Sequence, residues 1–166
     1  MFDYRIAYGC WLNDSREKPI VDEDWPSIRI DADTLSSLAT TMAFLKMAGY
    51  NYLDVFGLIT NHSWEDDIVS TVSAERREKV RAVIDIVHRN GLKVIYGLGV
   101  YSWGFDGIIA RNAEVRGTSA QAMCASSPAA DEIMRRVVDF VCETFAIDGC
   151  RHDVRNCFRG IGDGPR

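Results

Sequence analysis

Two residues of opposite charge, Arg151 and Asp153, stand two positions apart in the segment 148–154, which reads DGCRHDV. If this segment is a β-strand, both side chains lie on one face of it, because strand side chains alternate. A neighbouring guanidinium lowers the pKa of a carboxyl group and keeps it ionised, as a nucleophile or a charge stabiliser requires. The spacing therefore makes Asp153 a candidate catalytic carboxylate that Arg151 assists. The alternative interpretation is a surface ion pair without catalytic function.

Aromatic and polar residues gather at three further points of the sequence, each shortly after an apolar segment. Three of the four tryptophans lie at these points. A tryptophan ring stacks on the C–H face of a sugar, while amide and imidazole groups bond its hydroxyls. Three such points in one chain predict a carbohydrate-binding surface, although a single tryptophan usually packs beneath a loop. The candidate substrate-binding residues are Trp11, Asn61, His62, Trp64, Tyr101 and Trp103.

The sequence favours neither a metal site nor a cofactor. Its three histidines are scattered, and none stands at ligand spacing from a cysteine or another histidine. Gly97 and Gly99 form a G-x-G, but the third glycine of a dinucleotide-binding fingerprint is missing. The five cysteines form no C-x-x-C pair and are expected to be free thiols in a reducing compartment. His88 is expected to be exposed, and the acidic run 65–67 to be a solvated loop or a helix start.

Alternating strands and helices must position these residues. The apolar segments 5–12, 50–59 and 92–100 are predicted strands, and residues 145–150 lead into a fourth strand that can extend to 154. Asp31 or Asp33 caps a predicted helix whose apolar residues recur every three or four positions, and Gly49 suits its end.

Two further helices have clear start signals. Ser73 precedes one of them, and the pair Ser127-Pro128 provides an N-cap and a first helical residue for the other. The expected buried stripes are Val80, Val83, Ile84 and Val87 in the first, and Ile133, Met134, Val137, Val138 and Val141 in the second.

Four strands joined by helices indicate an α/β fold of parallel βα units with right-handed crossovers. Two architectures fit: the four-stranded half of a TIM-type (β/α)8 barrel, or a small doubly wound parallel sheet. The half-barrel is favoured, because long segments follow the strands, where barrel enzymes carry their active-site loops. The 166 residues fall short of the roughly 250 of a complete barrel. The partial barrel domain is predicted over 1–154, with an irregular tail over 155–166.

The composition is that of a globular domain, with 47% hydrophobic residues, 26% charged residues and a mean hydropathy of -0.10. A net charge of -5 argues against nucleic acid or an anionic membrane as a partner. No apolar run approaches the roughly 20 residues that span a bilayer. The first residues lack the pattern of a signal peptide, so a cytoplasmic location is expected.

Two motifs resemble those of glycoside-hydrolase barrels. Residues 87–95, VHRNGLKVI, look like the helix-to-strand junction H-x-x-G-[IL]-K-V-I, and 147–153, IDGCRHD, is similar to the α-amylase-type D-G-[FV]-R-x-D of the fourth strand. In that family the last aspartate is the nucleophile and the arginine assists it, which implies these roles for Asp153 and Arg151. The amylase-type D-x-x-x-N-H is absent after the third strand, so the chain looks closest to an uncharacterised glycosidase-like family.

The leading hypothesis is a glycoside-hydrolase-like barrel half that acts on a carbohydrate or glycoconjugate by carboxylate acid/base chemistry, without a cofactor. A non-catalytic sugar-binding or structural barrel fragment is the main alternative, and an oxidoreductase or lyase on the same fold is a third. A half-barrel leaves unpaired strand edges, so self-association of the chain is also expected.

Overall fold

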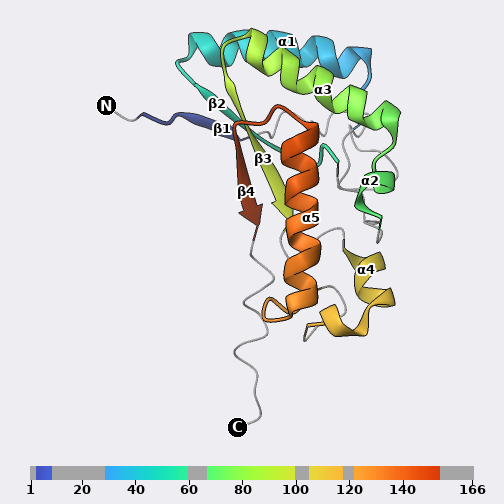
Figure 1. Ribbon diagram of the computed structural model, residues 1–166. Helices are drawn as coiled ribbons and strands as arrows, with labels where there is room; N and C mark the ends of the chain where they lie inside the picture. Colours follow the sequence, from blue (N-terminus) through green and yellow to red (C-terminus); the bar gives the residue numbers. More distant parts are fainter. Residues whose placement is uncertain (1–2, 9–28, 60–66, 100–104, 118–121, 154–166) are drawn as a thin grey trace, which may run out of the picture.

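The computed structural model describes residues 3–8, 29–59, 67–99, 105–117 and 122–153. Four strands of this part form one parallel sheet in which each strand pairs with its neighbour in the sequence (Figure 1). The strands are β1 (Ile6–Tyr8), β2 (Tyr52–Phe56), β3 (Lys93–Gly99) and β4 (Gly149–Asp153). The predicted tail, 155–166, lies outside the described residues.

The strand order β1-β2-β3-β4 decides between the two predicted architectures. Right-handed crossovers that always add the next strand on the same side place the connecting helices on one face of the sheet. A doubly wound sheet reverses its strand order and carries helices on both faces. The chain therefore has the α/β arrangement of consecutive units of a (β/α) barrel, and the doubly wound alternative is wrong.

The helices are α1 (Ala32–Met47), α2 (Ile68–Thr71), α3 (Ala74–Arg89), α4 (Asp106–Arg111), the 3-10 turn η2 (Ala113–Val115) and α5 (Pro128–Thr144). α1 and α3 lie side by side (Figure 1). α4 and η2 were not predicted from the sequence. They form because their apolar side chains enter the core, where Ile108, Ile109 and Val115 are buried.

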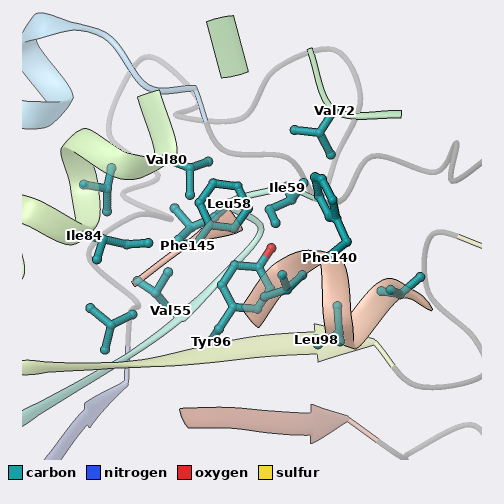
Figure 2. Packing of buried hydrophobic residues seen from close by; sticks show 14 of the residues in the cluster. Val55, Leu58, Ile59, Val72, Val80, Ile84, Tyr96, Leu98, Phe140 and Phe145 are labelled. Atoms are coloured by element: carbon teal, nitrogen blue, oxygen red, sulfur yellow. The ribbon is translucent and has the colours of Figure 1, made fainter. Parts of the chain in front are cut away.

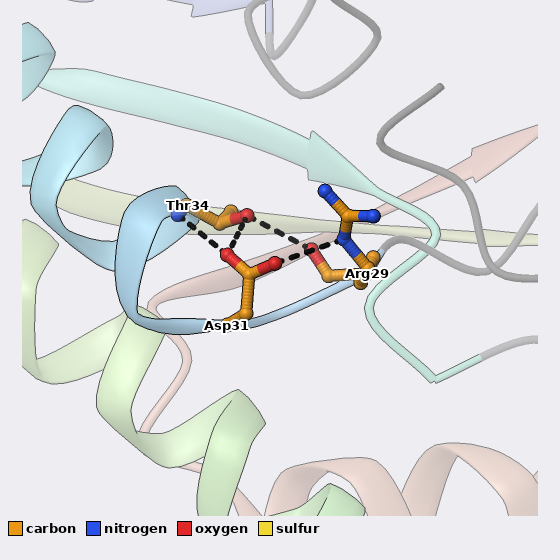
Figure 3. A network of polar contacts seen from close by, with 3 residues as sticks. All are labelled: Arg29, Asp31 and Thr34. Carbon is orange, nitrogen blue, oxygen red and sulfur yellow. Dashed lines mark hydrogen bonds and ion pairs between the residues drawn. The ribbon is translucent and has the colours of Figure 1, made fainter. Parts of the chain in front are cut away.

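The start of α1 is fixed by a small polar network (Figure 3). Asp31 is the N-cap, and its carboxylate accepts hydrogen bonds from the backbone N–H of Thr34 at 2.8 Å and from the Thr34 hydroxyl at 2.9 Å. Arg29 adds an ion pair to the same carboxylate at 2.9 Å. The helix ends before Gly49, whose φ of 86° places it in the left-handed region that glycine tolerates. The predicted helix is thus confirmed, with Asp31 as its cap.

The two later helices begin where the sequence predicts. The Ser73 hydroxyl caps α3 by accepting from the N–H of Arg76 at 3.1 Å, and Ser127 caps α5 by accepting from the N–H of Ala130 at 3.4 Å. The expected stripe of α3 is buried in full. In α5 the structure buries Met134, Val137 and Val141 and leaves Ile133 and Val138 partly buried.

The core lies between the helices and the face of the sheet that they cover (Figure 2). Tyr96 and Leu58 lie at its centre, fully buried. Phe145, from which the chain was expected to lead into the fourth strand, ends α5 and packs edge-on against Phe140, with ring centroids 6.2 Å apart. The strand begins at Gly149, which pairs in register with Ile95 of β3.

Candidate functional site

The face of the sheet opposite the helices carries a cluster of polar and aromatic side chains. Leu53 and Val55 of β2 are buried against the core, so Asp54 between them points to the opposite face. On β4, Cys150 pairs in register with the buried Tyr96, so the next residue, Arg151, lies on the same opposite face as Asp54. Tyr8 ends β1 in register with Asp54. Three strands thus contribute one side chain each to this face.

An ion pair joins the second strand to the fourth. The Nε of Arg151 donates to Oδ2 of Asp54 at 2.6 Å, and the two side chains are 30% and 7% exposed. The pair spans β3, and the two strands on either side of it, β2 and β4, lie about 9–10 Å apart. The register partner of Arg151 on β3 is Gly97, which has no side chain, so the guanidinium can lie across that strand.

The arginine also rests on an aromatic ring. Its guanidinium carbon lies 5.2 Å from the ring centroid of Tyr8, and its terminal nitrogen Nη2 donates to the Tyr8 hydroxyl at 3.5 Å. A guanidinium over a ring face at this distance is held by cation–π attraction. Tyr8 itself is 57% exposed. Arg151 is therefore held in position by a buried carboxylate from one side and an exposed ring from another.

Asp54 retains unused acceptor capacity within the described part of the chain. Its Oδ1 is buried and accepts no hydrogen bond from a described residue. A carboxylate oxygen that is buried without a partner costs free energy, about 1–3 kcal/mol for a typical polar group. A polar group placed at such a cost calls for an explanation, and a functional role is one of the explanations that applies.

The backbone of β4 brings the two predicted catalytic residues to one face. Arg151 and Asp153 are register partners of Gly97 and Gly99, and both lie in the carboxyl half of the sheet. The G-x-G of the sequence is thus part of strand β3, as expected. Its two glycines have no side chains, so β3 places none beside Arg151 and Asp153. The side chain of Asp153 lies outside the description, so its predicted role stays a prediction.

The other predicted site residues follow the carboxyl ends of the first three strands, the edge at which parallel barrel units carry their binding loops. All of them lie outside the described residues, and the carbohydrate surface therefore stays a prediction. They are Trp11, Asn61, His62, Trp64, Tyr101 and Trp103. The acidic run that ends at Asp67 is in part a helix start, because the Asp67 carboxylate caps α2 by accepting from the N–H of Val69 at 3.1 Å.

The opposite end of the sheet carries a second polar contact, which corrects a sequence prediction. His88 was expected to be exposed, but its Nε2 lies 2.8 Å from Oδ2 of Asp148 and it is partly buried. The same oxygen accepts the N–H of Val94 at 2.9 Å. Burial alone would raise the pKa of Asp148, but the Val94 and His88 hydrogen bonds lower it below its ordinary value. This contact ties α3 and β3 to β4 at the amino ends of the strands, where barrels place stabilising rather than catalytic residues.

The described ranges lack a metal-binding cluster and a membrane-spanning helix. No cluster of three or more histidine, cysteine or acidic residues there could hold a metal ion. Among the same residues, no helix has the length and apolar character needed to cross a membrane.

No protein-family model matches the sequence, and no curated protein matches it. A solved structure does. The chain is similar in structure to a noncanonic maltogenic α-amylase from Thermotoga neapolitana, with a TM-score of 0.51 at 15% sequence identity. The similarity covers 80% of this chain and 37% of the amylase. At this identity the likeness establishes the fold alone, the arrangement of consecutive (β/α) barrel units, and the chain spans little more than a third of the length of that amylase.

Asp54 was missed by the sequence analysis. The signal was present, because an aspartate at the centre of the strand YLDVF interrupts an otherwise apolar and aromatic run. A charged residue inside a buried strand is rare unless it is paired. Its partner lies 97 positions away, and that separation can be bridged only once the register of β2, β3 and β4 is known.

Proposed function

We propose that this chain is part of a glycoside-hydrolase-like barrel that acts on a carbohydrate or glycoconjugate. The observation that carries the proposal is the ion pair between Arg151 and the buried Asp54, which fixes an arginine two residues before Asp153. The similarity of fold to the α-amylase supports it, because that protein is a glycosidase. In this proposal Asp153 is the nucleophile or base, Arg151 assists it, and Asp54 positions Arg151.

The proposed chemistry follows from the charges on this face. Cleavage of a glycosidic bond needs one carboxylate that stays ionised and a second carboxyl group that donates a proton. A guanidinium on the same strand face favours the ionised form of Asp153. Asp54 is a poor candidate for the acid, because its Oδ2 is engaged by Arg151. Asp67 is also a poor candidate, because its carboxylate caps α2.

Binding would use the aromatic residues that follow the strands. Trp11, Trp64 and Trp103 would stack on sugar rings, while Asn61, His62 and Tyr101 would bond hydroxyls. The exposed ring of Tyr8 extends this surface onto the sheet itself, since it already covers the guanidinium of Arg151.

The test combines binding with turnover. The protein is titrated with maltotriose and with other neutral trisaccharides while tryptophan fluorescence is followed, and reducing-sugar release is measured with the same sugars. We expect saturable binding and slow hydrolysis that Asp153→Asn abolishes, by about a hundredfold or more even if the aspartate is only a general base. Asp85→Asn, which changes an exposed carboxylate of α3, is the matched control and should keep the wild-type rate.

Two results would contradict the enzymatic proposal. Binding without any hydrolysis would favour the sugar-binding module instead. Hydrolysis that persists at the wild-type rate in Asp153→Asn would remove the catalytic role of this residue, and the Arg151 ion pair would then be purely structural.

A further inference from the structure

Large apolar side chains lie exposed on the face of the sheet opposite the helices, which we call the open face. Tyr4, Ile6 and Tyr8 are 67%, 46% and 57% exposed, whereas Ala7 is buried against the core. The ring of Tyr4 contacts the ring of Tyr52 on the neighbouring strand, with centroids 5.4 Å apart. In an eight-stranded barrel this face forms the interior, and side chains from all eight strands fill it. The four described strands supply half of such an interior.

The two outer edges of the sheet are available for pairing within the described part of the chain. Among these residues, β1 pairs only with β2, and β4 pairs only with β3. Arg5 directs its C=O to the N–H of Tyr52 at 3.2 Å and its N–H to the side chain of Asn51 at 2.8 Å. Because backbone groups alternate in direction along a strand, the N–H and C=O of Ile6 point away from β2, to the outer edge.

We propose that two copies of this chain close one eight-stranded parallel barrel, in which β1 of each copy pairs with β4 of the other. A two-fold axis along the barrel satisfies the outer edges of both copies at once and keeps all the strands parallel. Eight strands also give an interior that side chains can just fill. This assembly depends on the strand edges and on no proposed catalytic group, so a monomeric protein and an inactive protein would be separate results.

The side chains that β1 and β4 place on the open face are complementary in size. β1 carries large residues there, whereas β4 begins with Gly149, which lies two positions before Arg151 and thus on the same face. A Cβ added at Gly149 would meet nothing within 4 Å. The large side chains of one β1 would lie over this space in the second copy, whereas two β1 edges brought together would crowd Tyr4 and Ile6 of both copies.

The charges of the open face also suit a second copy of the chain. Asp54 and Arg151 neutralise each other through their ion pair. Lys93, which lies 5.7 Å from the ring centroid of Tyr52, and Asp153 have opposite signs and stand at opposite ends of the strands. The whole chain carries a net charge of -5. Two open faces can therefore meet without the like-charge repulsion that other surfaces of the chain would bring.

The exposed apolar area is close to what a stable dimer needs. An aromatic side chain buries about 150–250 Å² when it is fully covered, so the exposed parts of Tyr4, Tyr8 and Ile6 together offer about 300 Å². A standard interface covers about 800 Å² on each partner, of which about 450–500 Å² is apolar. The open face supplies about two thirds of this apolar area, and the two strand edges add backbone hydrogen bonds. We therefore expect a dissociation constant in the micromolar range.

Analytical ultracentrifugation of the whole chain gives the first test. We expect an equilibrium between the 18.6 kDa monomer and a dimer of twice that mass, without larger species. Ile6→Lys places a charge in the barrel interior, and each dimer contains the substitution twice, so the dissociation constant should rise at least about tenfold. Val69→Lys makes the same change at a side chain of α2 that is 56% exposed, and it should leave the dissociation constant unchanged.

Ile6→Pro tests the strand edge separately from the open face. Proline removes the outward N–H, and an edge strand tolerates it. The monomer should therefore keep its circular dichroism spectrum, while the dissociation constant of the dimer rises at least about tenfold. If Ile6→Pro does not fold, Ile6→Lys still decides whether β1 lies in the interface.

Photo-cross-linking identifies the strands that meet. Tyr4 is replaced by p-benzoylphenylalanine, isotope-labelled and unlabelled chains are mixed and irradiated, and the tryptic peptides that link two copies are identified by mass spectrometry. Links from peptide 1–5 to peptide 137–151 or 152–155, which together contain β4, would support the closed barrel. Links from peptide 1–5 to peptide 1–5 or 6–16 of the other copy would show β1 against β1 and would overturn it. A monomer at tens of micromolar, assemblies that grow with concentration, or a dimer unaffected by Ile6→Lys would overturn it as well.

Discussion

Arg151→Met should destabilise the protein more than Asp54→Asn, although each variant breaks the same ion pair. Removing the guanidinium leaves the Asp54 carboxylate, 7% exposed, without the group that neutralises it. Removing the carboxylate leaves a guanidinium that is 30% exposed and still rests on Tyr8. Water can solvate the guanidinium that remains in Asp54→Asn, but not the carboxylate that remains in Arg151→Met. The two single variants should therefore differ in stability.

The magnitudes follow from burial. Breaking a fully buried pair costs about 3–5 kcal/mol, because one charge is left uncompensated. Since this pair reaches solvent through the arginine, we expect about 2–4 kcal/mol for Arg151→Met and about 1–2 kcal/mol for Asp54→Asn. The double variant removes both charges and should cost about 1–3 kcal/mol less than the sum of the single variants.

Urea unfolding followed by circular dichroism measures all three free energies of unfolding. The matched control is Lys79→Met, which breaks the exposed pair between Lys79 and Glu75 on α3 and should leave the stability nearly unchanged. The reasoning fails if Arg151→Met costs no more than Asp54→Asn, or if the single effects simply add. Either result would mean that the Asp54 carboxylate is well solvated in solution.

Three further outcomes follow from other parts of the fold. Asp31→Ala should lower the free energy of unfolding by about 1 kcal/mol, because the α1 cap is lost. Asp33→Ala, in the same first turn, is the control and should cost clearly less. Equal losses in urea unfolding would argue against the cap. The lowered pKa of Asp148 means that its charge stabilises the fold above pH about 4 and that this contribution is lost as the pH falls through the folded pKa. Asp148→Asn should therefore cost about 1 kcal/mol at pH 6 and little near pH 2, and a pH-independent cost in urea titrations would contradict the charge argument. The exposed side chains on the open face of β1 and the edges of the sheet predict self-association, and a sharp monomer peak in size-exclusion chromatography with light scattering at tens of micromolar would contradict it.

The sequence predicted those parts of the fold, the helix starts and ends, that depend on residues close together in the chain. Ser73 and the pair Ser127-Pro128 begin helices because a hydroxyl can cap free backbone N–H groups from its own position in the chain. Gly49 ends one because it tolerates a left-handed backbone. The same signals could not place the start of β4, because that start is set by pairing of Gly149 with Ile95 of β3, which is distant in the sequence.

The polar contacts of the candidate site lay beyond such local reasoning. Asp54 and Arg151 are 97 positions apart, and His88 and Asp148 are 60 positions apart. Each pair meets only because the sheet has a particular strand order and register. The sequence placed Arg151 and Asp153 on one strand, which is β4, but it could not reveal that the arginine reaches across β3 to the carboxylate of Asp54.

The two polar contacts also differ in what they do for the fold. The His88–Asp148 contact satisfies a backbone N–H and joins three elements, so ordinary stabilisation accounts for it. The Asp54–Arg151 pair buries a carboxylate and leaves Oδ1 without a partner among the described residues, and an apolar pair of similar volume would often stabilise a sheet as well or better. A cost of this kind is explained if the pair holds the guanidinium still beside the end of β4. The free energy of unfolding of Arg151→Met and the turnover of Asp153→Asn therefore address one question, whether the arginine is positioned for packing or for chemistry.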